Sequence, residues 1–145
     1  MNETTVILNL YRRPKYLLTQ IEMIRKQTKP PKEIWLWVNR SEENEKLDLG
    51  AIPVDRVIAS SYNWGCFGRF TIGLMAETDF ICVFDDDTIP GPKWLENCLD
   101  SFAKKEGLYG SAGIIIEDPN DHSKQTRVGW PSQNRTLTKV DLVGH

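Results

Sequence analysis

Strand-length apolar runs alternate with segments of helical periodicity along this chain of 145 residues. Apolar residues that recur every three or four positions predict amphipathic helices, and short runs rich in β-branched and aromatic residues predict buried strands. Helices are expected over 15–27, over 67–77 and from Trp94 to Phe102. Strands are expected over 5–11, 33–39, 56–60, 78–84 and 109–116. This alternation predicts an α/β fold with a mostly parallel sheet flanked by helices.

The C-terminal part of the chain carries a weaker pattern. Residues 117–138 are polar and contain Pro119, Gly129 and Pro131. Proline and glycine at this density interrupt regular elements, so we expect a long loop or an irregular hairpin here. A last strand is expected over 140–143.

The composition is that of an ordinary globular domain. Lys and Arg total 18 against 20 Asp and Glu, a formal net charge of −2, and 40% of the residues are hydrophobic. This length is typical of one domain with its own core, so we expect a single domain over 1–145. The balanced charge argues against a nucleic-acid-binding protein, which normally carries a basic patch.

The expected surroundings follow from what the sequence lacks. The longest apolar runs have the length of strands, so no membrane-spanning segment is expected. The first residues show no basic head followed by an apolar stretch, so no signal peptide is expected. Three separated cysteines form no disulfide framework. A reducing, cytoplasmic location is the simplest expectation.

Polar side chains follow several of the predicted strands at the point where each strand ends. In parallel α/β sheets, ligands bind outside the carboxyl ends of the strands. The positions to consider are therefore Asn9, Tyr11, Asn39, Ser60 to Asn63, and Asp85 to Asp87.

The three consecutive aspartates after the apolar strand over 78–84 are the sharpest of these features. Adjacent like charges are unfavourable unless something neutralises them, and Mg²⁺ or Mn²⁺ bound by carboxylates and phosphate oxygens would do so. If the segment stays extended, Asp85 and Asp87 face one side and Asp86 the other. The alternative is a solvated acidic turn before Pro90.

Other phosphate chemistries fit the sequence less well. A phosphatase motif of the form D-x-D-x-[TV] is off by one position, because Thr88 follows Asp87 directly. No P-loop motif occurs. A sugar-phosphate nucleotidyltransferase would carry a glycine-rich basic loop after the first strand, where Arg12-Arg13-Pro14 supplies charge but no glycine.

Several short motifs, in the right order, together resemble the family 2 glycosyltransferases, which have the GT-A fold of nucleotide-diphospho-sugar transferases. The acidic triplet also resembles the exostosin-like transferases, which share this fold. The matching segments are the first strand over 6–11, the helix end Lys26-Gln27-Thr28, the second strand over 33–41, Asn63-Trp64-Gly65 with Gly68-Arg69, and the strand with its aspartates over 80–87.

The resemblance implies roles for individual residues. Asp87 is expected to bind Mn²⁺ or Mg²⁺ with support from Asp85, while Asp86 is expected to bind ribose or the donor sugar. Tyr11 is expected to stack on the base. The full set expected to bind the nucleotide-sugar donor is Asn9, Tyr11, Asn39, Asn63, Gly65, Arg69, Asp85 and Asp86.

The sequence also departs from the family pattern. Asn39 stands where the family usually has an aspartate that reads the base, and Arg12 replaces the usual asparagine after Tyr11. The acidic catalytic base has no clear counterpart, so no catalytic residue is assigned. Complete members are usually longer, so we expect a GT-A domain truncated at its C-terminus, with the acceptor part missing.

The resemblance implies a metal-dependent glycosyltransferase, with an inverting mechanism favoured. It would move a sugar from a nucleoside-diphosphate sugar, a UDP-sugar being favoured, to a hydroxyl of a sugar, glycan or other acceptor. Two alternatives stay open. The chain would then be a donor-binding module without turnover on its own, or a sugar-phosphate nucleotidyltransferase.

Overall fold

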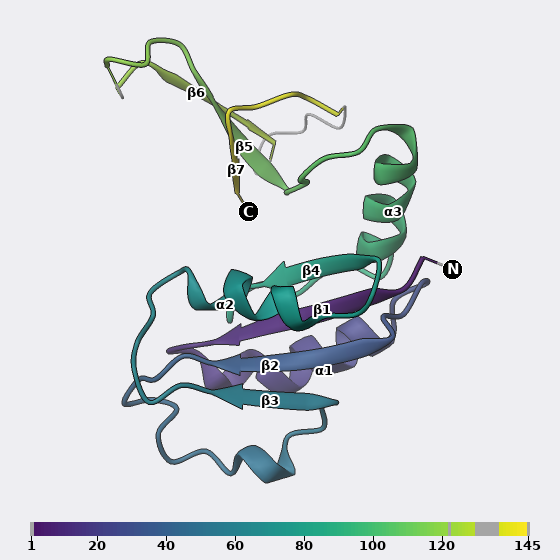
Figure 1. Ribbon diagram of the computed structural model, residues 1–145, viewed down its shortest axis with the longest axis vertical. Helices are drawn as coiled ribbons and strands as arrows, with labels where there is room; N and C mark the ends of the chain where they lie inside the picture. Colours follow the sequence, from purple (N-terminus) through teal and green to yellow (C-terminus); the bar gives the residue numbers. More distant parts are fainter. Residues whose placement is uncertain (1, 122, 130–136, 145) are drawn as a thin grey trace. The chain divides into compact units, whose positions relative to one another are not determined.

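The computed structural model describes residues 2–121, 123–129 and 137–144. The chain divides into two compact units, Met1–Asn97 and Cys98–His145. The division falls within helix α3 (Trp94–Lys104), and each unit is described by itself (Figure 1). The expectation of one domain over 1–145 stays a prediction.

The first unit is built on a four-stranded parallel sheet. Its strands are β1 (Thr4–Leu10), β2 (Glu33–Val38), β3 (Arg56–Ala59) and β4 (Phe80–Phe84), in the order β3-β2-β1-β4. All three pairings are parallel, so the four carboxyl ends meet at one edge (Figure 1). The predicted α/β fold with a parallel sheet is confirmed. Because the strands are parallel, the polar residues that follow them lie at one edge of the sheet.

Helix α1 (Leu17–Arg25) covers one face of this sheet and follows a short 3₁₀ turn, η1 (Pro14–Tyr16). Its buried side chains Leu17, Ile21 and Ile24 pack in one cluster with Val6 and other residues of β1 and β2. A helix with apolar residues at this spacing is stabilised mainly by burying that stripe. Every residue of β1 is buried, as expected for the centre of a sheet covered on both faces.

The opposite face carries a second cluster formed by Ile7, Trp35, Trp37 and Ile72. The covering segment is shorter than the predicted helix over 67–77. It consists of a four-residue helix, α2 (Gly68–Thr71), followed by the 3₁₀ turn η3 (Ile72–Met75). A Cβ atom on Gly68 would lie 2.5 Å from the Trp37 ring, so only glycine permits this close approach.

Within the segment predicted as a helix over 67–77, the apolar side chains of Phe67, Phe70 and Leu74 point outward. These side chains are 72%, 60% and 88% exposed. Contact with the sheet is made instead by Gly68 and Ile72, which are buried. Gly68, rather than Phe67 or Phe70, therefore decides which side of this segment packs against the sheet.

The second unit contains a separate three-stranded antiparallel sheet. The strands are β5 (Ala112–Ile116), β6 (Gln125–Gly129) and β7 (Leu142–Gly144), in the order β6-β5-β7. The strand predicted over 109–116 is therefore shorter than expected and does not extend the parallel sheet. The hairpin alternative for 117–138 is confirmed where β6 pairs with β5, while 130–136 lie outside the described residues.

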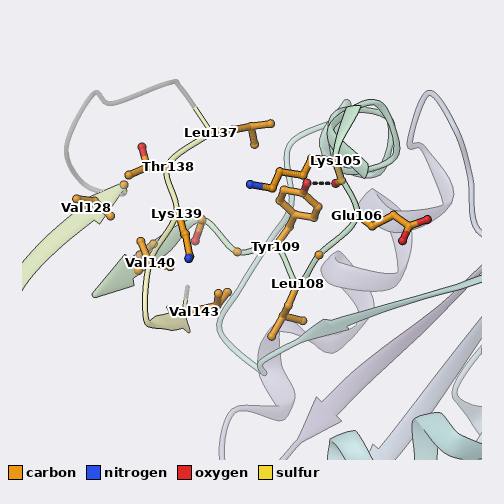
Figure 2. Close-up of a pocket in the computed structure, with 16 residues that line it drawn as sticks. Lys105, Glu106, Leu108, Tyr109, Val128, Leu137, Thr138, Lys139, Val140 and Val143 are labelled. Carbon is orange, nitrogen blue, oxygen red and sulfur yellow. Dashed lines mark hydrogen bonds between the residues drawn. The ribbon is translucent and has the colours of Figure 1, made fainter. Parts of the chain in front are cut away.

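A cavity of about 470 Å³ lies within the second unit (Figure 2). Leu108, Leu137, Val140 and Val143 contribute apolar side chains to its lining. Tyr109 fixes the segment beside it, because its hydroxyl donates to the Lys105 carbonyl and lies 3.3 Å from the Ser101 carbonyl. No expected site residue lies in this unit.

No helix in the described ranges is both long and apolar enough to cross a membrane.

Candidate functional site

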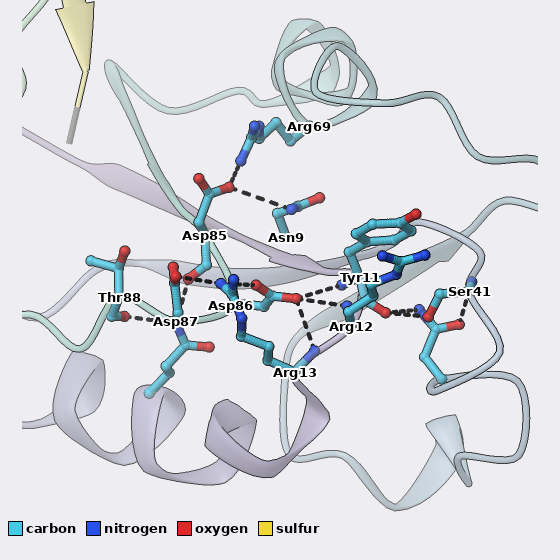
Figure 3. Close-up of polar contacts among 12 residues, drawn as sticks. Asn9, Tyr11, Arg12, Arg13, Ser41, Arg69, Asp85, Asp86, Asp87 and Thr88 are labelled. Atoms are coloured by element: carbon cyan, nitrogen blue, oxygen red, sulfur yellow. Dashed lines mark hydrogen bonds and ion pairs between the residues drawn. The ribbon is translucent and has the colours of Figure 1, made fainter.

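The acidic triplet lies where β4 ends, beside the end of β1. Leu8 pairs with Phe84 in the sheet, so the next residues, Asn9 and Asp85, are neighbours. Asn9 Nδ2 donates to Asp85 Oδ1 at 3.4 Å, while Asn9 Oδ1 is buried without a hydrogen-bond partner. The two strand ends therefore bring the expected residues Asn9 and Asp85 together (Figure 3).

Asp86 holds the turn that follows β1. Its Oδ2 accepts hydrogen bonds from three successive backbone N–H groups, those of Tyr11 at 3.2 Å, Arg12 at 2.8 Å and Arg13 at 3.0 Å. The residue is 7% exposed. A carboxylate with three such donors is well compensated for its loss of water. The contact expected between Asp86 and the donor stays a prediction. The Asp86 carboxylate already stabilises the turn after β1.

Gln20, on the buried side of α1, fixes the backbone of the triplet. Its Nε2 donates to the carbonyls of Asp85 and Thr88, both at 2.7 Å. The Thr88 N–H in turn donates to the Asp85 carbonyl at 3.1 Å. Residues 85–88 therefore form a turn rather than an extended strand.

This turn changes the expected directions of the aspartates. Alternation of side chains holds only in extended backbone, and β4 ends at Phe84. Asp85 pairs with Arg69, whereas Asp86 and Asp87 share Arg13. The expectation that Asp85 and Asp87 face one side and Asp86 the other is therefore wrong.

Two arginines supply positive charge to the triplet. Arg69 pairs with Asp85 and donates from Nε to the Cys66 carbonyl at 3.0 Å. Its side chain is 13% exposed, and burial lowers the pKa of the Arg69 guanidinium. Arg13 is 50% exposed and contacts Asp87 and, at 3.4 Å, Asp86. These two arginines thus reduce the repulsion among the three aspartates, and that repulsion was the reason to expect a cation.

Asn39 organises a second group of expected residues. Its Nδ2 donates to Asn63 Oδ1 at 2.9 Å and to the Gly65 carbonyl at 3.1 Å, and its Oδ1 accepts from the Trp64 N–H at 2.9 Å. Gly65 has φ of +59°, a conformation that glycine adopts without strain. Asn39 is 2% exposed, so its amide serves to hold the loop.

The loop held by Asn39 also reaches the turn after β1. Asn63 Nδ2 donates to the Tyr11 hydroxyl at 3.0 Å. Tyr11, Asn39, Asn63 and Gly65 therefore form one connected group, whereas Asn9, Arg69 and Asp85 form another. Both groups lie at the carboxyl edge of the sheet, as expected.

Three residues with clear tasks at this edge were not predicted. Gln20 shares the apolar face of α1 with Leu17 and Ile21, and a polar residue on such a face is a signal that sequence can provide. Arg13 and Asn44 carry no such signal. Asn44 is 4% exposed and its Nδ2 donates to the Tyr11 carbonyl at 2.9 Å and the Asn39 carbonyl at 2.8 Å.

Asp85 and Asp87 fit a divalent cation in the kind of ligand they offer. Their carboxylates are hard oxygen donors, and the side chains are 23% and 47% exposed. Within the described part of the chain, no group of three or more His, Cys, Asp or Glu side chains is arranged to hold a metal ion. The described side chains alone thus supply an incomplete ligand set.

The sequence matches Glycosyl transferase family 2 over residues 5–143. The chain belongs to this family. The resemblance inferred from the short motifs is therefore confirmed. A comparison with curated proteins finds no match.

Solved structures with the same fold include S. aureus TarS, its fragment 1–349, and that fragment in complex with UDP. Each is 18% identical over 79% of this chain, with a TM-score of 0.57. This family 2 chain spans 21% of the first of these chains and 34% of the other two. At this identity the likeness shows the fold alone, and it confirms the expected GT-A fold.

Proposed function

We propose that this chain binds a nucleoside-diphosphate sugar and transfers the sugar to an acceptor hydroxyl, with inversion at the anomeric carbon. A UDP-sugar is the favoured donor and a sugar or glycan the favoured acceptor. Membership of family 2 supports the reaction class. The choice of UDP is supported by relatives of the same fold, since TarS 1–349 is described in complex with UDP and with UDP-GlcNAc.

The observation that carries this proposal is the half-exposed Asp87 beside Asp85 at the carboxyl edge of the sheet. Ligands of open parallel sheets bind outside this edge. The cation would be Mn²⁺ or Mg²⁺, held by Asp87, with Asp85 as a second ligand once its carboxylate turns away from Arg69. When bound, it stabilises the negative charge that develops on the diphosphate leaving group.

Other residues at this edge of the sheet bind the donor or hold the loops that bind it. Tyr11 stacks on the base, with its hydroxyl held by Asn63. Asn39 keeps Asn63 and Gly65 in place along the base pocket, which is a less direct role than hydrogen bonding to the base edge. Asp86 holds the turn that presents Tyr11. Asn9 and Arg69 complete the donor site through Asp85.

Calorimetric titration tests donor binding directly. UDP, GDP, dTDP and CTP are each titrated into the chain with and without Mn²⁺, and the series is repeated with D87N. We expect UDP to bind best, Mn²⁺ to strengthen its binding at least tenfold, and D87N to remove most of that gain. The proposal fails if no nucleoside diphosphate binds, or if Mn²⁺ and D87N make no difference.

A second assay addresses turnover. The chain is offered UDP-sugars with Mn²⁺, and release of UDP is followed over hours, with the anomeric configuration of any product read by NMR. Binding of UDP and Mn²⁺ without release of UDP would favour a donor-binding module. Preferred binding of a nucleoside triphosphate with release of pyrophosphate would favour a nucleotidyltransferase.

A further inference from the structure

Arg13 occupies a position at the site that none of the expected roles explains. Its backbone N–H donates to Asp86 Oδ2 at 3.0 Å, so the base of the side chain is fixed. The guanidinium then turns back over the triplet, where Nη1 contacts Asp86 Oδ1 at 3.4 Å and Asp87 Oδ2 (Figure 3). The positive end of Arg13 therefore lies on the carboxylate that the proposed function gives to the cation.

We propose that Arg13 is an exchangeable counter-ion of the donor site. Its guanidinium neutralises Asp87 in the ligand-free chain and passes to the diphosphate of the donor when a divalent cation takes that carboxylate. This inference rests on the proposed function, because it requires both a cation at Asp87 and a diphosphate beside it.

Competition at Asp87 follows from charge and exposure. A divalent cation and a guanidinium both bind the carboxylate through its oxygens, so each weakens the binding of the other. The Arg13 and Asp87 side chains are 50% and 47% exposed. An ion pair as exposed as this one contributes little free energy, which makes it easy to exchange.

The diphosphate of the donor is a suitable second partner for the Arg13 guanidinium. A guanidinium binds phosphate oxygens through a planar fork of N–H donors. Because Asp86 holds the Arg13 backbone and not only its side chain, the released guanidinium stays beside the triplet. Its positive charge is then available to the phosphates that the cation also contacts.

Arg12 provides a matched control next to Arg13 in the chain. It is also an arginine with its backbone N–H on Asp86, at 2.8 Å. Its side chain, however, lies over the Tyr11 ring at 5.1 Å and pairs with Glu43 at 3.7 Å. Replacing it removes the same charge without removing a side-chain contact with the triplet.

The test measures Mn²⁺ and UDP binding separately in wild type, R13Q, R13K and R12Q. Mn²⁺ alone is titrated and followed by the paramagnetic resonance signal of the free ion, and UDP is then titrated by calorimetry at saturating Mn²⁺. We expect R13Q to bind Mn²⁺ about two- to fivefold more tightly, the gain from releasing an exposed ion pair. We expect it to bind UDP about tenfold more weakly, the loss of one charge-assisted contact.

Opposite changes in the two affinities are the signature of exchange. R12Q should change the Mn²⁺ affinity by less than about twofold, because the Arg12 side chain pairs with Glu43 and not with the triplet, and an exposed charge is screened. R13K keeps the charge without the fork, so its Mn²⁺ affinity should stay near wild type while UDP binding weakens. The double variant R13Q/D87N should bind Mn²⁺ no more tightly than D87N alone.

Failures of the two proposals are distinguishable. If wild type binds both Mn²⁺ and UDP but R13Q shifts Mn²⁺ affinity no more than R12Q does, the exchange is wrong and the proposed function stands. An unchanged UDP affinity in R13Q also overturns the exchange. If wild type and R13Q bind neither Mn²⁺ nor UDP, both proposals fall together.

Discussion

The carboxyl edge of the parallel sheet contains two layers of polar side chains that differ in what they contact. The inner layer consists of Gln20, Asn39 and Asp86, which are 2%, 2% and 7% exposed. Most of their hydrogen bonds go to backbone groups of the loops at this edge. The outer layer, Arg13 and Asp87, is about half exposed, and the Arg13 guanidinium contacts the carboxylates of Asp86 and Asp87.

This difference indicates that the inner layer stabilises the loops of the site, whereas the outer layer is available to bind ligands. Buried polar groups contribute to stability because removing one leaves its partners without hydrogen bonds. Half-exposed ion pairs contribute little to folding, since water competes for both charges. We therefore expect substitutions in the inner layer to lower the free energy of unfolding and those in the outer layer to change ligand binding.

The largest expected effect is that of D86A. The change leaves three backbone N–H groups of the turn after β1 without their acceptor, so we expect the free energy of unfolding to fall by about 3 kcal/mol. Urea denaturation followed by tryptophan fluorescence measures this. A loss below about 1 kcal/mol would show that water replaces the carboxylate and that the inner layer is not structural here.

N39A should have the next largest effect. It removes two amide donors and one acceptor that hold Asn63, Trp64 and Gly65, and we expect a loss of about 2 kcal/mol. The same urea denaturation applies, with limited proteolysis to report cleavage within residues 60–66. N63A serves as the control, because it keeps Asn39 and its two backbone bonds. Equal loss in both variants would contradict a special role for the buried amide.

Q20L is expected to cost about 1 kcal/mol. The leucine fills the same space on the buried side of α1 but leaves the carbonyls of Asp85 and Thr88 without their amide donor. Thermal unfolding compares it with T19L, a substitution at the exposed neighbouring position. If Q20L is as stable as T19L, the turn over 85–88 does not depend on this contact.

The fold was predictable from sequence wherever a pattern is local. The runs that became β1, β2 and β4 are continuous and apolar, and their ends place Asn9, Asn39 and Asp85 at one edge. The segment after Cys66 was harder, because Gly68 rather than Phe67 faces the sheet. Only the contact with Trp37, 31 residues earlier in the chain, decides that orientation.

The sequence placed the candidate residues at the strand ends, but it did not indicate their contacts. The sequence shows that Asp86 follows a strand, but not that three N–H groups of another turn surround it. It shows two arginines after Tyr11, but not that Arg13 turns to Asp87 while Arg12 turns to Glu43. Such choices depend on backbone turns that bring distant segments together, and no local periodicity encodes them.

The smallest expected effect on stability is that of D87A. It compares the outer layer with the inner layer most directly. Asp87 and Asp86 are the same residue type in adjacent positions of one turn, so composition and propensity are matched. D87A removes a half-exposed ion pair with Arg13 and also a negative charge next to Asp86, and these changes oppose each other. We expect the free energy of unfolding to change by less than about 0.5 kcal/mol in urea. A loss approaching that of D86A would mean that Arg13 and Asp87 belong to the inner layer, and the guanidinium would then be too firmly held to exchange.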